Sequence, residues 1–205
     1  IKKQMTAGGT TIGIEFAGSQ KDAFKFMDWR DGTVAGVPAR VFRISFSGEL
    51  AYEVNVDASY GDYIWNELMK AGKEFDITPC GLGCRDTLRL EKGFCLYGND
   101  INDETSPIEA GLGWITKFNH PFMMSEHHKA IKENKPTKKL VGFELVDKGI
   151  PRQHYPLCDA SGAVIGEVTS GTMSPSLNKA IGLGYVKSEF AAAAAAARRL
   201  PTILV

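Results

Sequence analysis

The chain has 205 residues, of which 43% are apolar and 23% charged, ordinary values for a globular protein that buries a sizeable core. Its 24 basic and 24 acidic side chains balance, so it lacks the basic excess that nucleic-acid binders and membrane-surface proteins use to meet phosphates. No apolar run approaches the roughly 20 residues that span a bilayer, and no signal-peptide pattern is visible. We therefore expect neither a nucleic acid nor a membrane as a partner.

The cysteines and histidines form no pattern typical of a metal site. The four cysteines match no common zinc spacing, and a chain of this length does not depend on disulfides. His127 and His128 are neighbours, so they do not face one ion from the same helix. We expect no bound metal and reduced thiols, as in a cytoplasmic protein, or a mitochondrial one in a eukaryote. The cysteines are Cys80, Cys84, Cys95 and Cys158.

The first predicted elements are a short helix over residues 21–29 and an Asp-Gly turn at 31–32. Apolar and polar residues then alternate over 41–46 and over 51–56, on either side of a Ser-Gly turn signal. This pattern predicts a β-hairpin with one apolar face and with Glu53 on the less apolar face. The apolar face comprises Phe42, Ile44 and Phe46 on the first strand and Tyr52, Val54 and Val56 on the second.

Two helices are predicted next. Apolar residues recur with a helical period over 60–75, and Asp57 or Ser59 is suited to cap the start of this helix. After a proline, residues 81–90 predict a short second helix that ends at Gly93. The apolar stripe of the first helix comprises Ile64, Leu68, Ala71 and Phe75.

The last part of the sequence predicts mainly strands. Residues 111–118 resemble a strand, and the polar stretch that follows resembles a linker. Beyond the linker, short apolar runs alternate with close turn signals, which is typical of a small antiparallel barrel or sandwich. The strands expected there cover residues 140–146, 164–170 and 180–186.

These elements predict an α+β fold with two parts. We expect an α+β unit over residues 1–118, incomplete at its N-terminal side, then a linker over 119–138 and a β-barrel domain over 139–205. The alanine run at 191–197 predicts a helix by propensity. The alternative is that alanine stands there for residues that were not identified, so we assign the run no function.

Three side chains are candidates for ligand binding on chemical grounds. Arg85 and Arg89 lie one turn apart on the predicted second helix, close to acidic residues. Such arginines can pair with carboxylates inside the protein, or their planar guanidinium groups can bind a ligand's carboxylate or carbonyl group. Glu53 is either an exposed strand residue or an acceptor of two N–H bonds from an amino-pyrimidine edge. The acidic partners available to the arginines are Asp86, Glu91 and Asp100.

Three long, specific motifs lie between residues 81 and 186. They read GLGCRDTLRLEKGFCLYGNDINDETSPIEAGLGWITKF at 81–118, KLVGFELVDKGIPR at 139–152 and GEVTSGTMSPSLNKAIGLGYV at 166–186. All three resemble the aminomethyltransferase of the glycine cleavage system, the T-protein family. Residues 31–56 are instead more similar to the folate domain of the sarcosine oxidase α subunit, with a Ser-Phe-Ser-Gly-Glu turn where T-proteins usually carry Gly-Tyr-Thr-Gly. The two families are related and share one tetrahydrofolate-binding architecture.

The resemblance implies a folate-binding aminomethyltransferase fold, with a ferredoxin-like unit followed by a small antiparallel β-barrel. It implies transfer of a one-carbon unit from the aminomethyl-lipoyl H-protein to tetrahydrofolate, with release of ammonia and without a metal. Glu53 and Arg85 match the family's folate-binding glutamate and arginine, and Tyr52, Tyr97 and Trp114 are weaker candidates for lining the folate site. Arg89, with Glu91, is then the internal structural pair. We expect the family's catalytic aspartate to lie in an N-terminal half outside these 205 residues.

Two other functions remain open. The chain could be the folate-binding domain of an enzyme of the sarcosine oxidase or dimethylglycine dehydrogenase type, or a non-catalytic folate-binding relative. The motif Gly-Leu-Gly-Cys-Arg-Asp, which contains Arg85, favours the T-protein, because the oxidase type usually lacks an arginine there.

Overall fold

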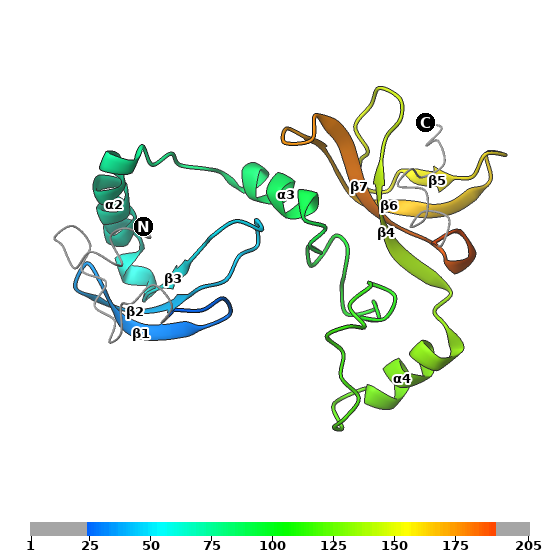
Figure 1. Ribbon diagram of the computed structural model, residues 1–205, viewed down its shortest axis with the longest axis horizontal. Coiled ribbons are helices and arrows are strands. Elements are labelled where there is room, and N and C mark those ends of the chain that lie inside the picture. Colours follow the sequence, from blue (N-terminus) through cyan, green and yellow to red (C-terminus); the bar gives the residue numbers. More distant parts are fainter. Residues whose placement is uncertain (1–23, 192–205) are drawn as a thin grey trace. The chain divides into compact units, whose positions relative to one another are not determined.

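The computed structural model describes residues 24–191. The chain divides into two compact units, Ile1–Arg85 and Asp86–Val205 (Figure 1). Helices occur together with two antiparallel sheets, neither of them closed, so the predicted α+β class is confirmed. Within the described residues, none of the helices has the length and apolar character needed to cross a membrane.

The first unit contains a three-stranded antiparallel sheet in the order β1-β2-β3. Its strands are β1 (Trp29–Val34), β2 (Val37–Phe42) and β3 (Glu53–Asn55). The turn between β1 and β2 falls at Ala35 and Gly36, whose φ angles of 50° and 79° suit a tight hairpin of type I′. The predictions of a turn at 31–32 and of a helix continuing to residue 29 were wrong, because β1 pairs with β2 from Trp29 onward.

The predicted pairing of the two strands around Glu53 is confirmed, with Val41 opposite Val54 and Phe42 opposite Glu53. The predicted apolar face of the first strand was wrong, because β2 ends at Phe42 and its alternation is shifted by one residue. The buried side chains of β2 are Val37, Ala39 and Val41.

Helix α2 (Gly61–Gly72) lies over the buried face of this sheet, as the helical period predicted (Figure 1). Ile64 is 5% exposed and packs in one cluster with the strand valines, and Leu68 packs against that cluster. Short 3-10 helices flank α2, namely η1 (Ala58–Tyr60) and η2 (Lys73–Phe75). Asp57 caps η1 by accepting a hydrogen bond from the Ser59 N–H at 2.9 Å. The sheet therefore has one covered face and one open face.

Helix α3 (Leu82–Glu91) confirms the second predicted helix, and the boundary between the two units falls within it. Gly93 ends the helix at a φ of 71°, and the Phe94 N–H donates back to the Arg89 carbonyl. Residues 111–118 form turns, so the strand predicted there was wrong. Gly111 adopts a φ of 75°, which breaks an extended run. Helix α4 (Ser125–Asn134) lies within the stretch that was expected to be a linker.

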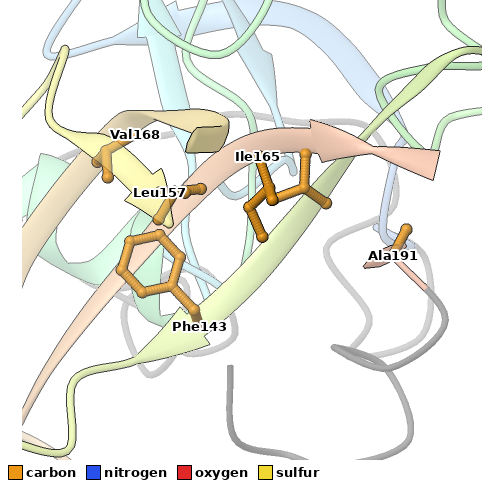
Figure 2. Close-up of a cluster of buried hydrophobic side chains, with 6 residues drawn as sticks. Phe143, Leu157, Ile165, Val168 and Ala191 are labelled. Carbon is orange, nitrogen blue, oxygen red and sulfur yellow. The ribbon is translucent and has the colours of Figure 1, made fainter. Parts of the chain in front are cut away.

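The second unit contains a four-stranded antiparallel sheet in the order β4-β7-β6-β5. Three of its strands were predicted, and β5 is an addition to the prediction. The core cluster combines side chains of all four strands with Ala191, and Phe143, Leu157 and Ile165 lie close together in it (Figure 2). The alanine run beyond Ala191 lies outside the described residues. The strands are β4 (Lys138–Glu144), β5 (Pro156–Cys158), β6 (Val164–Ser174) and β7 (Lys179–Lys187).

Candidate functional site

Glu53 lies on the open face of the first sheet. It is the first residue of β3 and stands directly opposite Phe42 on β2, so the two side chains share a face. Glu53 is exposed, whereas its neighbour Val54 packs toward the side covered by α2. The carboxylate is therefore available to a ligand on the face that α2 leaves open. The other side chains on that face are Trp29, Asp31, Arg40 and Asn55.

Arg85 lies in the second turn of α3 and is exposed. Its guanidinium carbon is 4.1 Å from the ring centroid of Phe46, which is a close cation–π contact. Phe46 belongs to the segment 43–52, which joins β2 to β3 and leads directly into Glu53. The same segment of the first unit thus contacts one candidate folate-binding residue and positions the other.

Tyr52 lies next to Glu53 but faces the other way. Its side chain packs against the core cluster below the sheet, and its ring centroid is 5.6 Å from that of Phe24. The alternation of side chains along a strand explains this difference between neighbours. Tyr52 therefore stabilises the strand that presents Glu53, and the structure does not bring the two side chains to one face.

Tyr97 and Trp114 belong to the second unit, and both side chains are exposed, at 67% and 72%. The Tyr97 hydroxyl donates to an oxygen of Asp103 at 2.5 Å, and this hydrogen bond raises the pKa of Tyr97 above its ordinary value. The aromatic surface of both residues is free for contact with a planar ligand.

Arg89 has the structural role predicted for it, but its partner is not Glu91. The side chain is fully buried, and its guanidinium donates to Asp86, to the Phe94 carbonyl, to Asp100 and to Ser170. Glu91 instead accepts hydrogen bonds from the Ser174 hydroxyl and the Ser176 N–H, which hold its pKa below the ordinary value.

Asp100 is the buried counter-charge of Arg89. Its Oδ2 is 2.5 Å from Arg89 Nη1 and accepts a second hydrogen bond from the Leu96 N–H at 2.9 Å. Its Oδ1 accepts from the hydroxyls of Thr169 and Ser170 on β6. The hydrogen bonds of Arg89 and Asp100 therefore connect α3 and the loop after it to β6. Nothing in the sequence pattern identifies the two hydroxyl partners, which lie about 70 residues away from Asp100 along the chain.

No cluster of three His, Cys, Asp or Glu side chains suited to hold a metal ion occurs among residues 24–191. The chemistry that the first unit offers to a ligand is that of an exposed carboxylate and of a guanidinium in cation–π contact with an aromatic ring. Together these groups can accept N–H bonds from one edge of a ligand and donate to its carbonyl or carboxylate.

Two domain families match the chain in sequence. Residues 15–120 match the GCVT N-terminal domain, and residues 138–198 match the glycine cleavage T-protein C-terminal barrel domain. The first match includes residues 31–56, the stretch that resembles the sarcosine oxidase folate domain. The C-terminal family is a barrel by name, whereas the four-stranded sheet described here is open.

Curated relatives and a solved structure agree with these matches. An aminomethyltransferase of Porphyromonas gingivalis is 53% identical over 169 residues, which is 80% of this chain and 47% of the relative. One from Halothermothrix orenii is 47% identical over 167 residues, 81% of this chain and 46% of the relative. The crystal structure of glycine cleavage system aminomethyltransferase T from Bartonella henselae superposes with a TM-score of 0.75 at 27% identity, covering 83% of this chain and 47% of that one.

The chain spans about half the length of the curated relatives it matches. The two family matches together extend over most of the chain, and a curated member is 53% identical to it over 169 residues. The chain belongs to the glycine cleavage T-protein family, whose curated members are named aminomethyltransferases.

Proposed function

We propose that the protein is a tetrahydrofolate-dependent aminomethyltransferase of glycine cleavage. It takes the aminomethyl group carried on the lipoyl sulfur of the H-protein, releases its nitrogen as ammonia and leaves the lipoyl group as the dithiol. The carbon becomes the methylene bridge of methylene-tetrahydrofolate. The observation that carries the proposal is the placement of Glu53 and Arg85 around one segment of the first unit, in a chain of the T-protein family.

The two residues have complementary roles toward folate. The pterin ring has an edge of N–H donors and a ring carbonyl. Burying one of these groups without a hydrogen-bond partner would cost about 1–3 kcal/mol. Glu53 accepts N–H bonds from the amino edge, and Arg85 donates to the carbonyl or to the carboxylate tail. Tyr97 and Trp114 belong to the second unit and are weaker candidates for contact with folate, through their exposed aromatic side chains.

The main contribution of the protein to the reaction is positioning. Holding the folate amine against the aminomethyl carbon can supply roughly 7–11 kcal/mol of the barrier. Glu53 and Arg85 hold the folate from two sides and so fix the direction in which its amine points. No residue of this chain is assigned a proton-transfer role. A cytoplasmic location is consistent with the bacterial origin of the relatives. The partner that delivers the aminomethyl group is the H-protein.

The second candidate function is a folate domain that accepts a methylene group produced by a flavin-dependent amine oxidase. Residues 31–56 favour it through their similarity to the sarcosine oxidase α subunit. Arg85 within the Gly-Leu-Gly-Cys-Arg-Asp motif and the two family matches favour the aminomethyltransferase. Methylene transfer that requires a flavoprotein partner instead of the H-protein would reverse this preference.

Replacing Glu53 or Arg85 with alanine is expected to weaken tetrahydrofolate binding by about 1–3 kcal/mol each, because each change leaves a polar group of the bound folate unpaired. Titration calorimetry on the full-length protein measures the effect. Glu49→Ala and Arg152→Ala remove exposed side chains of the same types and serve as matched controls that should leave affinity unchanged.

The thermal unfolding midpoint separates this assignment from a structural role. Both Glu53 and Arg85 are exposed, so their replacement should leave the midpoint near the wild-type value. Wild-type tetrahydrofolate affinity in both alanine variants would show that Glu53 and Arg85 do not bind folate. A lowered midpoint with unchanged affinity would make Arg85 a structural residue.

A further inference from the structure

We propose that Phe46 is a positioning residue for Arg85, and that its ring holds the guanidinium in the orientation that receives folate. The inference rests on the proposed function, since it assigns Phe46 a part in the same site. Phe46 lies in the segment between β2 and β3 and belongs to the motif Ser-Phe-Ser-Gly-Glu. The sequence pattern did not predict this role, because its strand alternation placed Phe46 on an apolar, buried face.

The geometry of the contact is the first argument. The guanidinium carbon of Arg85 is 4.1 Å above the Phe46 ring centroid, well inside the limit of about 6 Å for a cation–π contact. A guanidinium carries all of its N–H donors in its own plane. The Phe46 ring carries no nitrogen or oxygen acceptor, so the contact restrains the cation and leaves its donors available for a carboxylate or carbonyl.

A comparison within α3 shows what this restraint means. Arg89, one turn further along the helix, is fixed by four hydrogen bonds that engage its donors inside the protein. Arg85 is exposed, and the contact that the structure gives it is with an aromatic face. The first arrangement suits a structural arginine, and the second suits an arginine whose donors are kept for a ligand.

Restraint of an exposed arginine matters for affinity. A free arginine side chain populates many rotamers, and part of this conformational entropy is lost when it binds a ligand. Stacking on Phe46 lowers that loss, because the side chain is already ordered before the ligand arrives. Phe46 also belongs to the segment that leads into Glu53, so one segment sets the positions of both polar groups.

The test compares the tetrahydrofolate affinities of Phe46→Leu and Phe46→Tyr in the full-length protein. Leucine keeps an apolar side chain of similar size but has no aromatic face, whereas tyrosine keeps the face. A cation–π contact at an exposed site contributes about 0.5–1 kcal/mol, so Phe46→Leu is expected to raise Kd about 2- to 5-fold. Phe46→Tyr is expected to bind like the wild type.

A double-mutant cycle shows whether Phe46 acts through Arg85. In an Arg85→Ala background, Phe46→Leu should raise Kd no further, because the cation that the ring restrains is absent. An equal loss in both backgrounds, or wild-type affinity for Phe46→Leu, would overturn the inference while leaving the proposed function intact. A wild-type protein that binds no tetrahydrofolate would instead reject the proposed function and this inference with it.

Discussion

Replacing Asp100 with alanine is expected to lower the free energy of unfolding by about 3–5 kcal/mol, the cost of leaving a buried charge without its partner. Asp100 is 1% exposed and Arg89 is fully buried. An arginine cannot relieve the loss by releasing its proton. The hydroxyls of Thr169 and Ser170 would also lose an acceptor. Urea unfolding followed by circular dichroism measures the change.

Two further variants make this prediction specific to the buried pair. Asp103→Ala removes an exposed carboxylate from the same loop and should change stability little. The double variant Arg89→Met, Asp100→Leu should lose less than the sum of the single changes, because it leaves no uncompensated charge. Additive losses, or a stability for Asp100→Ala close to that of Asp103→Ala, would show that the pair does not stabilise the second unit.

Gly166→Ala is expected to be the most damaging substitution in the second sheet, costing about 3 kcal/mol or more through forced backbone movement. A Cβ atom at Gly166 would lie 1.9 Å from the Tyr185 carbonyl oxygen on the neighbouring strand β7. Backbone atoms cannot rotate away as a flexible side chain does. The required shift would reach Val186, which is 1% exposed and belongs to the core cluster of Figure 2.

Gly142→Ala on β4 is the matched control for Gly166→Ala. Its Cβ would meet only Leu183 Cδ2, at an ordinary contact distance of 3.7 Å. Both glycines lie inside strands of the same sheet, so loss of backbone flexibility affects them alike. Equal stability of the two variants in urea unfolding would contradict the close approach of β6 and β7 at Gly166.

Helices α2 and α3 and three strands of the second sheet were predictable because their signals are periodic and local, whereas helix α4 and strand β5 were missed. The helical period identified α2, and the short apolar runs identified β4, β6 and β7. Strand β1 was missed because an Asp-Gly pair has turn chemistry, while the pairing with β2 decides the actual conformation of residues 31–32. The apolar alternation over 41–46 was misread because β2 ends at Phe42 and buries Val37, Ala39 and Val41 instead.

The partners of the candidate site residues could not be predicted from the sequence. The spacing of Arg85 and Arg89 indicated that one of them could be internal, but it did not show which partners each would have. Arg89 reaches Ser170, which lies 81 residues away along the chain, and no local pattern contains that contact. The exposure of Glu53 followed from strand alternation alone, because one face of a half-covered sheet stays open.

The aminomethyl transfer itself is the most direct test of the proposed function. The full-length protein would be incubated with H-protein carrying an aminomethylated lipoyl group, with and without tetrahydrofolate, and ammonia and methylene-tetrahydrofolate would be measured. We expect release of ammonia that depends on tetrahydrofolate and matches the methylene product one to one, with lower rates at subsaturating folate for Glu53→Ala and Arg85→Ala. Ammonia release that does not respond to tetrahydrofolate, or methylene transfer only with an amine-oxidising flavoprotein, would contradict it.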